Sequence, residues 1–182
     1  MRHDTRKLVF LSLLVAMGTA LHVVEGMIAI PLPVPGVKLG LANLATLLAL
    51  RFYCLRDALT VALLRVMLAS LIGGFFLSPG FLLAVTGAFG STLIMALLLE
   101  HTRCFSMIGI SVAGATVHNL GQLLAASLLL QSGAIVYYLP VLLLAALPTG
   151  ICTGHLLNSL LQSNSGALLA FAPRREHDNL LL

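Results

Sequence analysis

Long uninterrupted runs of apolar residues dominate the chain, and charged residues mark the ends of these runs. Residues 66–99 form 34 consecutive positions without Asp, Glu, Lys or Arg, and residues 104–173 form 70. A helix that crosses the hydrocarbon core of a bilayer needs about 20 apolar residues. The longer run therefore holds two spans joined by a turn at Gln131-Ser132-Gly133, and the shorter run is broken at Ser78-Pro79-Gly80.

The pattern predicts an all-α, polytopic membrane protein with six transmembrane helices. These helices are expected over residues 8–24, 40–53, 58–77, 81–99, 105–130 and 134–160. The apolar runs are continuous, whereas the strands of a membrane β-barrel alternate. The membrane domain thus covers 8–160, between an N-terminal segment 1–7 and a tail 161–182. The start of the chain also resembles a secretory signal with a cleavage site at Ala16-Met17-Gly18, but we interpret it as the first transmembrane helix.

Basic residues predict the orientation of the bundle. Segments 1–7, 51–57, 100–104 and 161–182 together hold eight of the ten Lys and Arg residues, whereas the opposite loops hold only Lys38. Cytoplasmic loops of membrane proteins carry an excess of Lys and Arg. We therefore expect both termini to be cytoplasmic.

The composition agrees with a protein surrounded by lipid. Hydrophobic residues make up 59% of the chain and charged residues 9%, with a mean hydropathy of +1.06. Soluble domains contain about 25% charged residues, and disordered chains have low hydrophobicity. With 6% aromatics and no Trp, the chain offers no stacking platform for a nucleic acid. Its three cysteines show neither disulfide nor zinc spacing, so no metal or cofactor is expected.

The segment 25–39 is an unusual external loop, because it is apolar apart from Glu25 and Lys38 and contains three prolines at alternate positions. Only 12 uncharged residues, 39–50, lie between Lys38 and Arg51. At 1.5 Å each they reach about 18 Å, short of a core of about 30 Å. The loop is therefore expected to dip into the outer half of the membrane and cover a cavity, a pattern typical of transport sites. A plain external loop, with Lys38 in water, is the alternative.

Two groups of polar side chains interrupt the predicted helices. Arg65 lies about 10 Å into the third helix, where an arginine costs about 2.5 kcal/mol or more. It is expected to anchor an anionic ligand or to act as counter-ion to Glu25; snorkelling to the inner surface is the alternative. The second group is His118, Asn119 and Gln122 in the fifth helix. These side chains are expected to face a substrate, or else to form hydrogen bonds between helices.

Motifs for autonomous catalysis are missing from the sequence. Neither lysine lies in a G-x-x-x-x-G-K-[ST] loop, so ATP hydrolysis of that type must come from a partner. The three aspartates, Asp4, Asp57 and Asp178, are far apart, whereas magnesium-dependent diphosphate chemistry needs clustered carboxylates. We therefore predict that the chain is not an enzyme.

Three stretches carry a resemblance to a known family: P-G-V-K-L-G-L-A-N at 35–43, Leu64-Arg65-Val66, and H-N-L-G-Q at 118–122 with the small-residue run before it. They resemble the bacterial Gx transporter family, also described as heptaprenyl diphosphate synthase component I, over roughly residues 20–160. That family is similar to the substrate-binding S components of energy-coupling factor transporters, which are six-helix proteins of the bacterial cytoplasmic (inner) membrane.

The resemblance implies roles for several residues. It implies that Ala16 and Ala20 contact a transmembrane coupling subunit, and that the loop before the second helix gates the pocket. The motif positions implied for the site are Lys38, Asn43, Arg65, His118, Asn119 and Gln122.

The leading hypothesis is a substrate-binding subunit of an ATP-driven uptake system for a micronutrient or small organic molecule. Because Lys38, Arg65 and a protonated His118 outnumber Glu25, the substrate is expected to be anionic or zwitterionic. Membrane lipid, a coupling subunit and ATPase subunits are the expected partners. The alternatives are a noncatalytic membrane subunit of a polyprenyl diphosphate synthase and a subunit of a quinone-linked redox complex.

Overall fold

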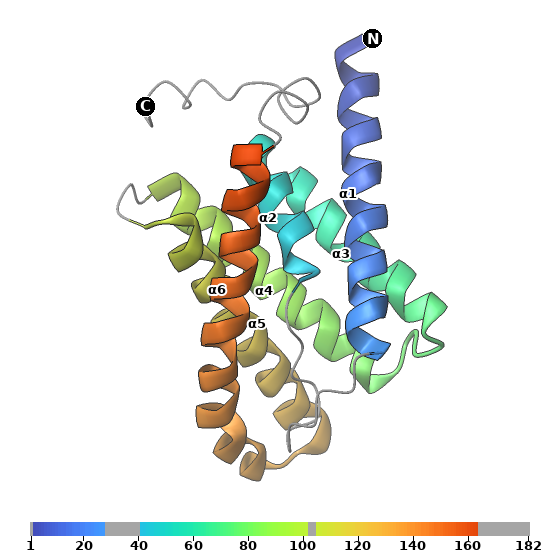
Figure 1. Ribbon diagram of the computed structural model, residues 1–182. Coiled ribbons are helices and arrows are strands. Elements are labelled where there is room, and N and C mark those ends of the chain that lie inside the picture. The colour runs from blue at the N-terminus through green and yellow to red at the C-terminus, as the bar shows by residue number, and fades with distance from the viewer. Residues whose placement is uncertain (1, 28–40, 102–104, 164–182) are drawn as a thin grey trace.

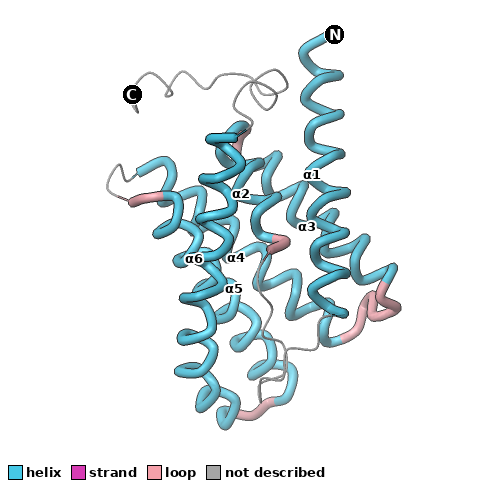
Figure 2. Tube along the Cα trace, viewed as in Figure 1, coloured by secondary structure: helices cyan, strands magenta, loops and turns pink. Residues whose placement is uncertain are grey.

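The structure, a computed structural model, describes residues 2–27, 41–101 and 105–163. These residues form helices and the turns between them, without any strand (Figure 2), which confirms the all-helical prediction. The helices are α1 (Arg2–Met27), α2 (Asn43–Phe52), α3 (Leu55–Ile72), α4 (Pro79–His101), α5 (Met107–Leu130), the 3₁₀ helix η1 (Gly133–Tyr138) and α6 (Leu139–Ser163).

The six α-helices run alternately up and down through one bundle (Figure 1). Helices α4, α5 and α6 pack side by side, α1 packs on α3, and the short α2 lies between α1, α3, α4 and α6. The N-terminal end of α1, the junction of α2 with α3 and the C-terminal end of α6 lie at the same end of the bundle (Figure 1). An even number of passes through the bundle produces this arrangement; that this end is cytoplasmic stays a prediction from the basic residues.

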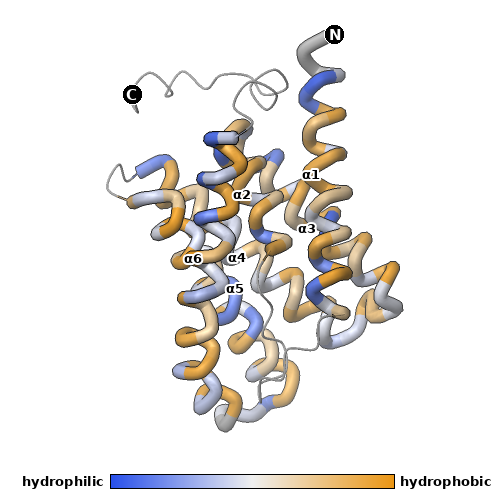
Figure 3. Tube along the Cα trace, in the orientation of Figure 1, coloured by the Kyte–Doolittle hydropathy of each residue, from blue (hydrophilic) through white to orange (hydrophobic). Residues whose placement is uncertain are grey.

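Four helices are long and apolar enough to cross a membrane. They cover Thr5–Met27, Pro79–His101, Met107–Leu130 and Ile135–Ser163, with mean hydropathies between 1.2 and 2.1. Large apolar side chains such as Leu128, Leu130 and Leu144 are exposed on the outer surface, and the outer helices are coloured mainly as hydrophobic in Figure 3. A water-exposed protein rarely shows such extensive apolar surface, so the chain is a multi-pass helical membrane protein. A total of six spans remains a prediction, since α2 has only ten residues and α3 carries three charged ones.

Several predicted boundaries are corrected by the structure. Helix α3 ends at Ile72 instead of Leu77, and the chain turns over residues 73–78, where Gly74 has a φ of 71°. Pro79 is the first residue of α4 and does not lie in the turn between the two helices. Proline fits the first position of a helix, because its missing N–H is not needed there. The predicted break at Ser78-Pro79-Gly80 was therefore placed too late.

The ends of two other helices also differ from the prediction. Helix α1 continues to Met27, so the first residues of the predicted loop 25–39 are helical, and residues 28–40 lie outside the described part. The sixth helix is preceded by η1. Consequently Pro140 lies in the first turn of α6 and only Pro148 is inside the helix.

One group of polar contacts connects α1 with the α2–α3 junction at the end that is predicted to be cytoplasmic. Lys7 Nζ lies 2.8 Å from Asp57 Oδ2 and 5.7 Å from the centre of the Tyr53 ring. Cys54 Sγ donates to the same carboxylate oxygen at 3.1 Å. Burial opposes the ionisation of Asp57, but hydrogen bonds from Lys7 and Cys54 outweigh it, so the pKa of this carboxyl lies below its usual value.

Close packing of α5 against α6 depends on two glycines of α6. A Cβ atom added at Gly150 would lie 2.5 Å from the Val112 Cα atom, and one at Gly154 would lie 2.6 Å from the Ile108 Cα atom. Small residues let helix backbones approach closely in membranes, where packing replaces the hydrophobic effect as the main attraction between helices. The glycines therefore determine the position of α6, which contributes to the site described below.

Gly150→Ala is expected to lower the free energy of unfolding by about 1–3 kcal/mol, because the added methyl group must push two backbones apart. The measurement is unfolding in mixed micelles with increasing SDS. Gly26→Ala is the matched control, since nothing lies within 4 Å of a Cβ at that position. Equal stability of the two variants would contradict the close contact of α5 with α6.

Candidate functional site

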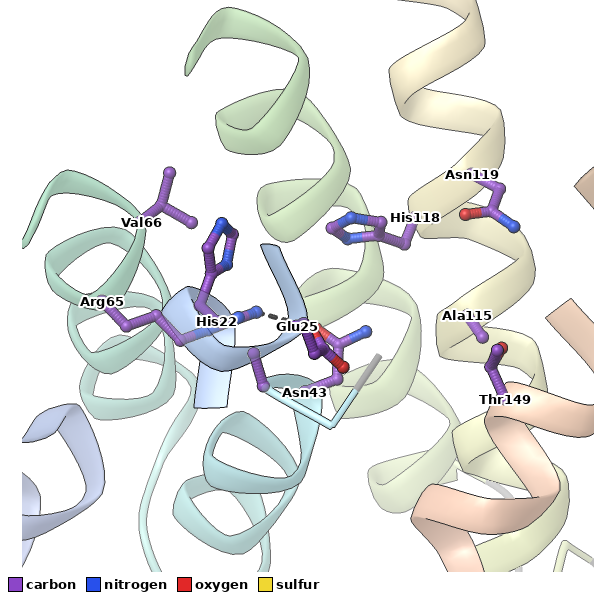
Figure 4. A pocket seen from close by; sticks show the side chains of 10 residues that line it. His22, Glu25, Asn43, Arg65, Val66, Ala115, His118, Asn119 and Thr149 are labelled. Atoms are coloured by element: carbon purple, nitrogen blue, oxygen red, sulfur yellow. Dashed lines mark hydrogen bonds between the residues drawn. The ribbon is translucent and has the colours of Figure 1, made fainter. Parts of the chain in front are cut away.

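A narrow, partly open pocket lies within the bundle, where five helices meet. The space open to the centre of a water molecule is about 20 Å³, and the total of about 440 Å³ of empty space includes solvent at the open mouth. The pocket is lined by His22, Glu25, Ala42, Asn43, Arg65, Val66, Ala115, His118, Asn119 and Thr149. Most of these residues are polar (Figure 4), although the helices around them are mainly apolar (Figure 3).

Arg65 of α3 is the largest fully buried side chain of the described residues, with 2% of its surface exposed. Its Nη2 atom donates a hydrogen bond of 2.7 Å to Asn43 Oδ1 at the start of α2 (Figure 4). Space for the arginine comes from Gly18 of α1, because a Cβ atom there would lie 3.0 Å from Arg65 Cδ. The side chain thus points into protein, and the alternative that it snorkels to the surface is wrong.

Glu25 connects the end of α1 with the start of α2. Its carboxylate accepts a hydrogen bond from the backbone N–H of Leu41 and is close enough to attract Arg65 electrostatically. Only 6% of the residue is exposed. Glu25 and Arg65 therefore face the same pocket with opposite charges, as the interpretation of Arg65 as a counter-ion expects.

The three polar residues of α5, His118, Asn119 and Gln122, do not all line the pocket. His118 points from α5 toward the side of the pocket that carries His22 (Figure 4). Asn119 also lines the pocket, but its Nδ2 atom donates to the Leu142 carbonyl of α6 at 2.9 Å, so it forms an interhelical bond as well. Gln122 packs against Gly87 of α4 and does not belong to the lining residues.

Two polar lining residues, His22 and Thr149, were not predicted from the sequence. His22 lies three positions before Glu25, and residues at this spacing share one face of a helix, so a search of the first helix for polar pairs could have found it. Thr149 donates its hydroxyl hydrogen to carbonyls of the preceding turn, at 3.0 Å from Ala145 O and 3.1 Å from Ala146 O. A threonine of this kind gives no signal in an apolar helix.

The other predicted site residues lie elsewhere. Lys38 lies outside the described residues. Ala16 and Ala20 are exposed one turn apart on α1 and are not part of the pocket. Within the described ranges, no three His, Cys, Asp or Glu side chains gather in a way that could hold a metal ion.

The fold and the pocket define a class, namely multi-pass helical membrane proteins with a polar cavity inside the bundle. The chain belongs to the family described as Heptaprenyl diphosphate synthase component I, which it matches over residues 14–160. That range begins within α1 and ends within α6, so it includes every lining residue of the pocket. The comparisons with curated proteins and with solved structures give no match.

This result confirms the part of the predicted resemblance that concerns the synthase component. The family's description makes its members one component of a heptaprenyl diphosphate synthase, which is compatible with a subunit that is not itself an enzyme. The similarity to transporter S components remains a prediction.

Asn43→Ala is expected to lower the free energy of unfolding by about 1.5–3 kcal/mol, because a hydrogen bond to a buried charged group is lost. Unfolding with SDS in mixed micelles measures the change. Asn158→Ala, in the half-buried part of α6 away from the pocket, is the matched control. An Asn43 variant that is no less stable than the Asn158 variant would mean that the Arg65–Asn43 bond is not formed.

Proposed function

We propose that the protein is a membrane-embedded binding subunit that captures a small polar organic molecule in this pocket. The captured molecule would then enter the cell by uptake that a partner drives with ATP. The single observation behind the proposal is the fully buried guanidinium of Arg65, fixed by Asn43 at the wall of the pocket.

Stability alone does not account for Arg65. Buried ion pairs can often be replaced by well-packed apolar residues without loss of stability, and ionisable residues in membrane helices usually mark pathways or binding sites. Here Arg65, Glu25, His22 and His118 come from three helices and face one cavity. Their convergence supports ligand binding better than it supports packing.

The location of the pocket fits uptake from outside. Its α1 and α2 residues lie near the end of α1 and the start of α2, which the positive-inside prediction places on the outer side. The chain lacks the lysine loop that ATP hydrolysis of the common type requires, so energy has to come from a partner. This division of labour is the one that the resemblance to S components implies.

A second candidate function is favoured by the family description. As component I of a heptaprenyl diphosphate synthase, the chain would be the membrane subunit that holds a soluble catalytic component near its lipid-like product. In that case the main function would belong to the surface of the bundle at the cytoplasmic end, and the polar pocket would not need a soluble ligand.

One purification tests both candidates. The full chain is extracted from bacterial membranes in polymer nanodiscs, and bound small molecules and proteins are identified by mass spectrometry. We expect a small polar compound that is enriched with the wild type, is lost with Arg65→Gln, and is retained by the control Arg56→Gln at the exposed start of α3. ATPase and coupling subunits are expected among the bound proteins. A stoichiometric prenyl synthase component, together with no compound that depends on Arg65, would favour the second candidate instead.

A further inference from the structure

We infer that the ligand of this pocket is a small zwitterion, with its carboxylate bound by Arg65 and Asn43 and its cationic group bound near Glu25. The inference rests on the proposed capture function and narrows its substrate class. The supporting observation is the arrangement of polar and charged side chains from α1, α2 and α3 around the cavity.

The carboxylate half follows from the donors that meet where the start of α2 packs against α3. Arg65 uses Nη2 on Asn43, whereas its Nε atom is buried without a hydrogen-bond partner among the described residues. Such a donor is costly to leave unpaired. Because Asn43 accepts from the arginine through Oδ1, its amide nitrogen remains a second donor in the lining of the same cavity. A planar guanidinium fork and an amide together match the two oxygens of a carboxylate.

The cationic half follows from Glu25. This buried carboxylate lines the same cavity and attracts Arg65, and its position is fixed by the Leu41 N–H. A ligand that carried only negative charge would gain from Arg65 but would be repelled by Glu25 in a poorly screened site. A ligand with a separate ammonium group meets an attractive partner at both ends.

The same balance disfavours a diphosphate ligand. Among the described lining residues, Arg65 is the one side chain that is permanently cationic, and Glu25 offsets its charge. Sites for transferred phosphates and diphosphates normally combine several cationic or backbone N–H donors. The pocket is therefore matched to a ligand of low net charge, which distinguishes it from a site for the prenyl diphosphate of the second candidate function.

The experiment measures binding to the full chain in lipid nanodiscs by isothermal titration calorimetry. The probes are the ω-amino acids from glycine to 6-aminohexanoate, the carboxylic acids and the amines of matching chain length, and inorganic pyrophosphate. We expect at least one amino acid to bind about tenfold or more tightly than its matched acid and its matched amine. Pyrophosphate is expected not to bind.

Two variants assign the ends of the ligand. Glu25→Gln keeps an oxygen that can accept from Leu41, so it should fold and should reduce the preference for the amino acid over its matched acid to about one. Arg65→Gln should abolish binding of the acids and the amino acids alike. Glu100→Gln, at the exposed end of α4, is the control and should change neither. Thermal unfolding of each variant verifies that it is folded.

The possible results distinguish failure of the zwitterion inference from failure of the proposed capture function. If acids or pyrophosphate bind as tightly as amino acids, or if Glu25→Gln leaves the preference unchanged, the zwitterion inference is wrong while capture of a ligand stands. If no probe binds to the wild type, the zwitterion inference is wrong, and the capture function is contradicted only if the nanodisc purification also yields no compound that depends on Arg65.

Discussion

A guanidinium buried inside an apolar bundle constrains everything around it. The cost of placing an arginine at membrane depth is offset only when its donors find acceptors and its charge finds a counter-charge. Here Asn43 supplies the acceptor and Glu25 supplies the charge. These three residues come from α3, α2 and α1, so the arginine determines how the first three helices meet and where a polar cavity can form.

The remaining helices complete the cavity through close backbone packing. Gly150 and Gly154 let α6 approach α5, and this approach allows Asn119 to reach the Leu142 carbonyl and places Thr149 at the wall of the pocket. The Lys7–Asp57 contact connects α1 with α3 at the opposite end from Glu25. Polar contacts therefore hold α1 against its neighbours at both of its ends. The site lies between helices α1 to α3 on one side and the closely packed helices α4 to α6 on the other.

The ends of the helices were predicted accurately where charged residues border the apolar runs. Residues 81–99 and 105–130 were predicted within two residues of α4 and α5, because Glu100 and Arg103 delimit them. The end of α3 was predicted five residues too late, because the helix already ends before Gly73 and Gly74, whereas the prediction placed the break at Ser78-Pro79. Arg65, Glu25 and His118 stood out as polar residues in apolar surroundings, whereas Asn43 was implied only by the family resemblance. Their partners could not be predicted, because the Arg65–Asn43 bond joins residues 22 positions apart and depends on how two helices cross.

Water and small solutes should reach the cavity beside Arg65, and cysteine labelling measures whether they do. In a background with Cys54, Cys104 and Cys152 replaced by Ser, Ala115→Cys places a thiol on the pocket wall, whereas Ala88→Cys places one in the α4 core, where Ala88 has 0% of its surface exposed. Whole cells are treated with a small, membrane-impermeant methanethiosulfonate. We predict rapid modification of the thiol at position 115 and none at position 88; equal protection of both thiols would mean that solutes do not reach the cavity.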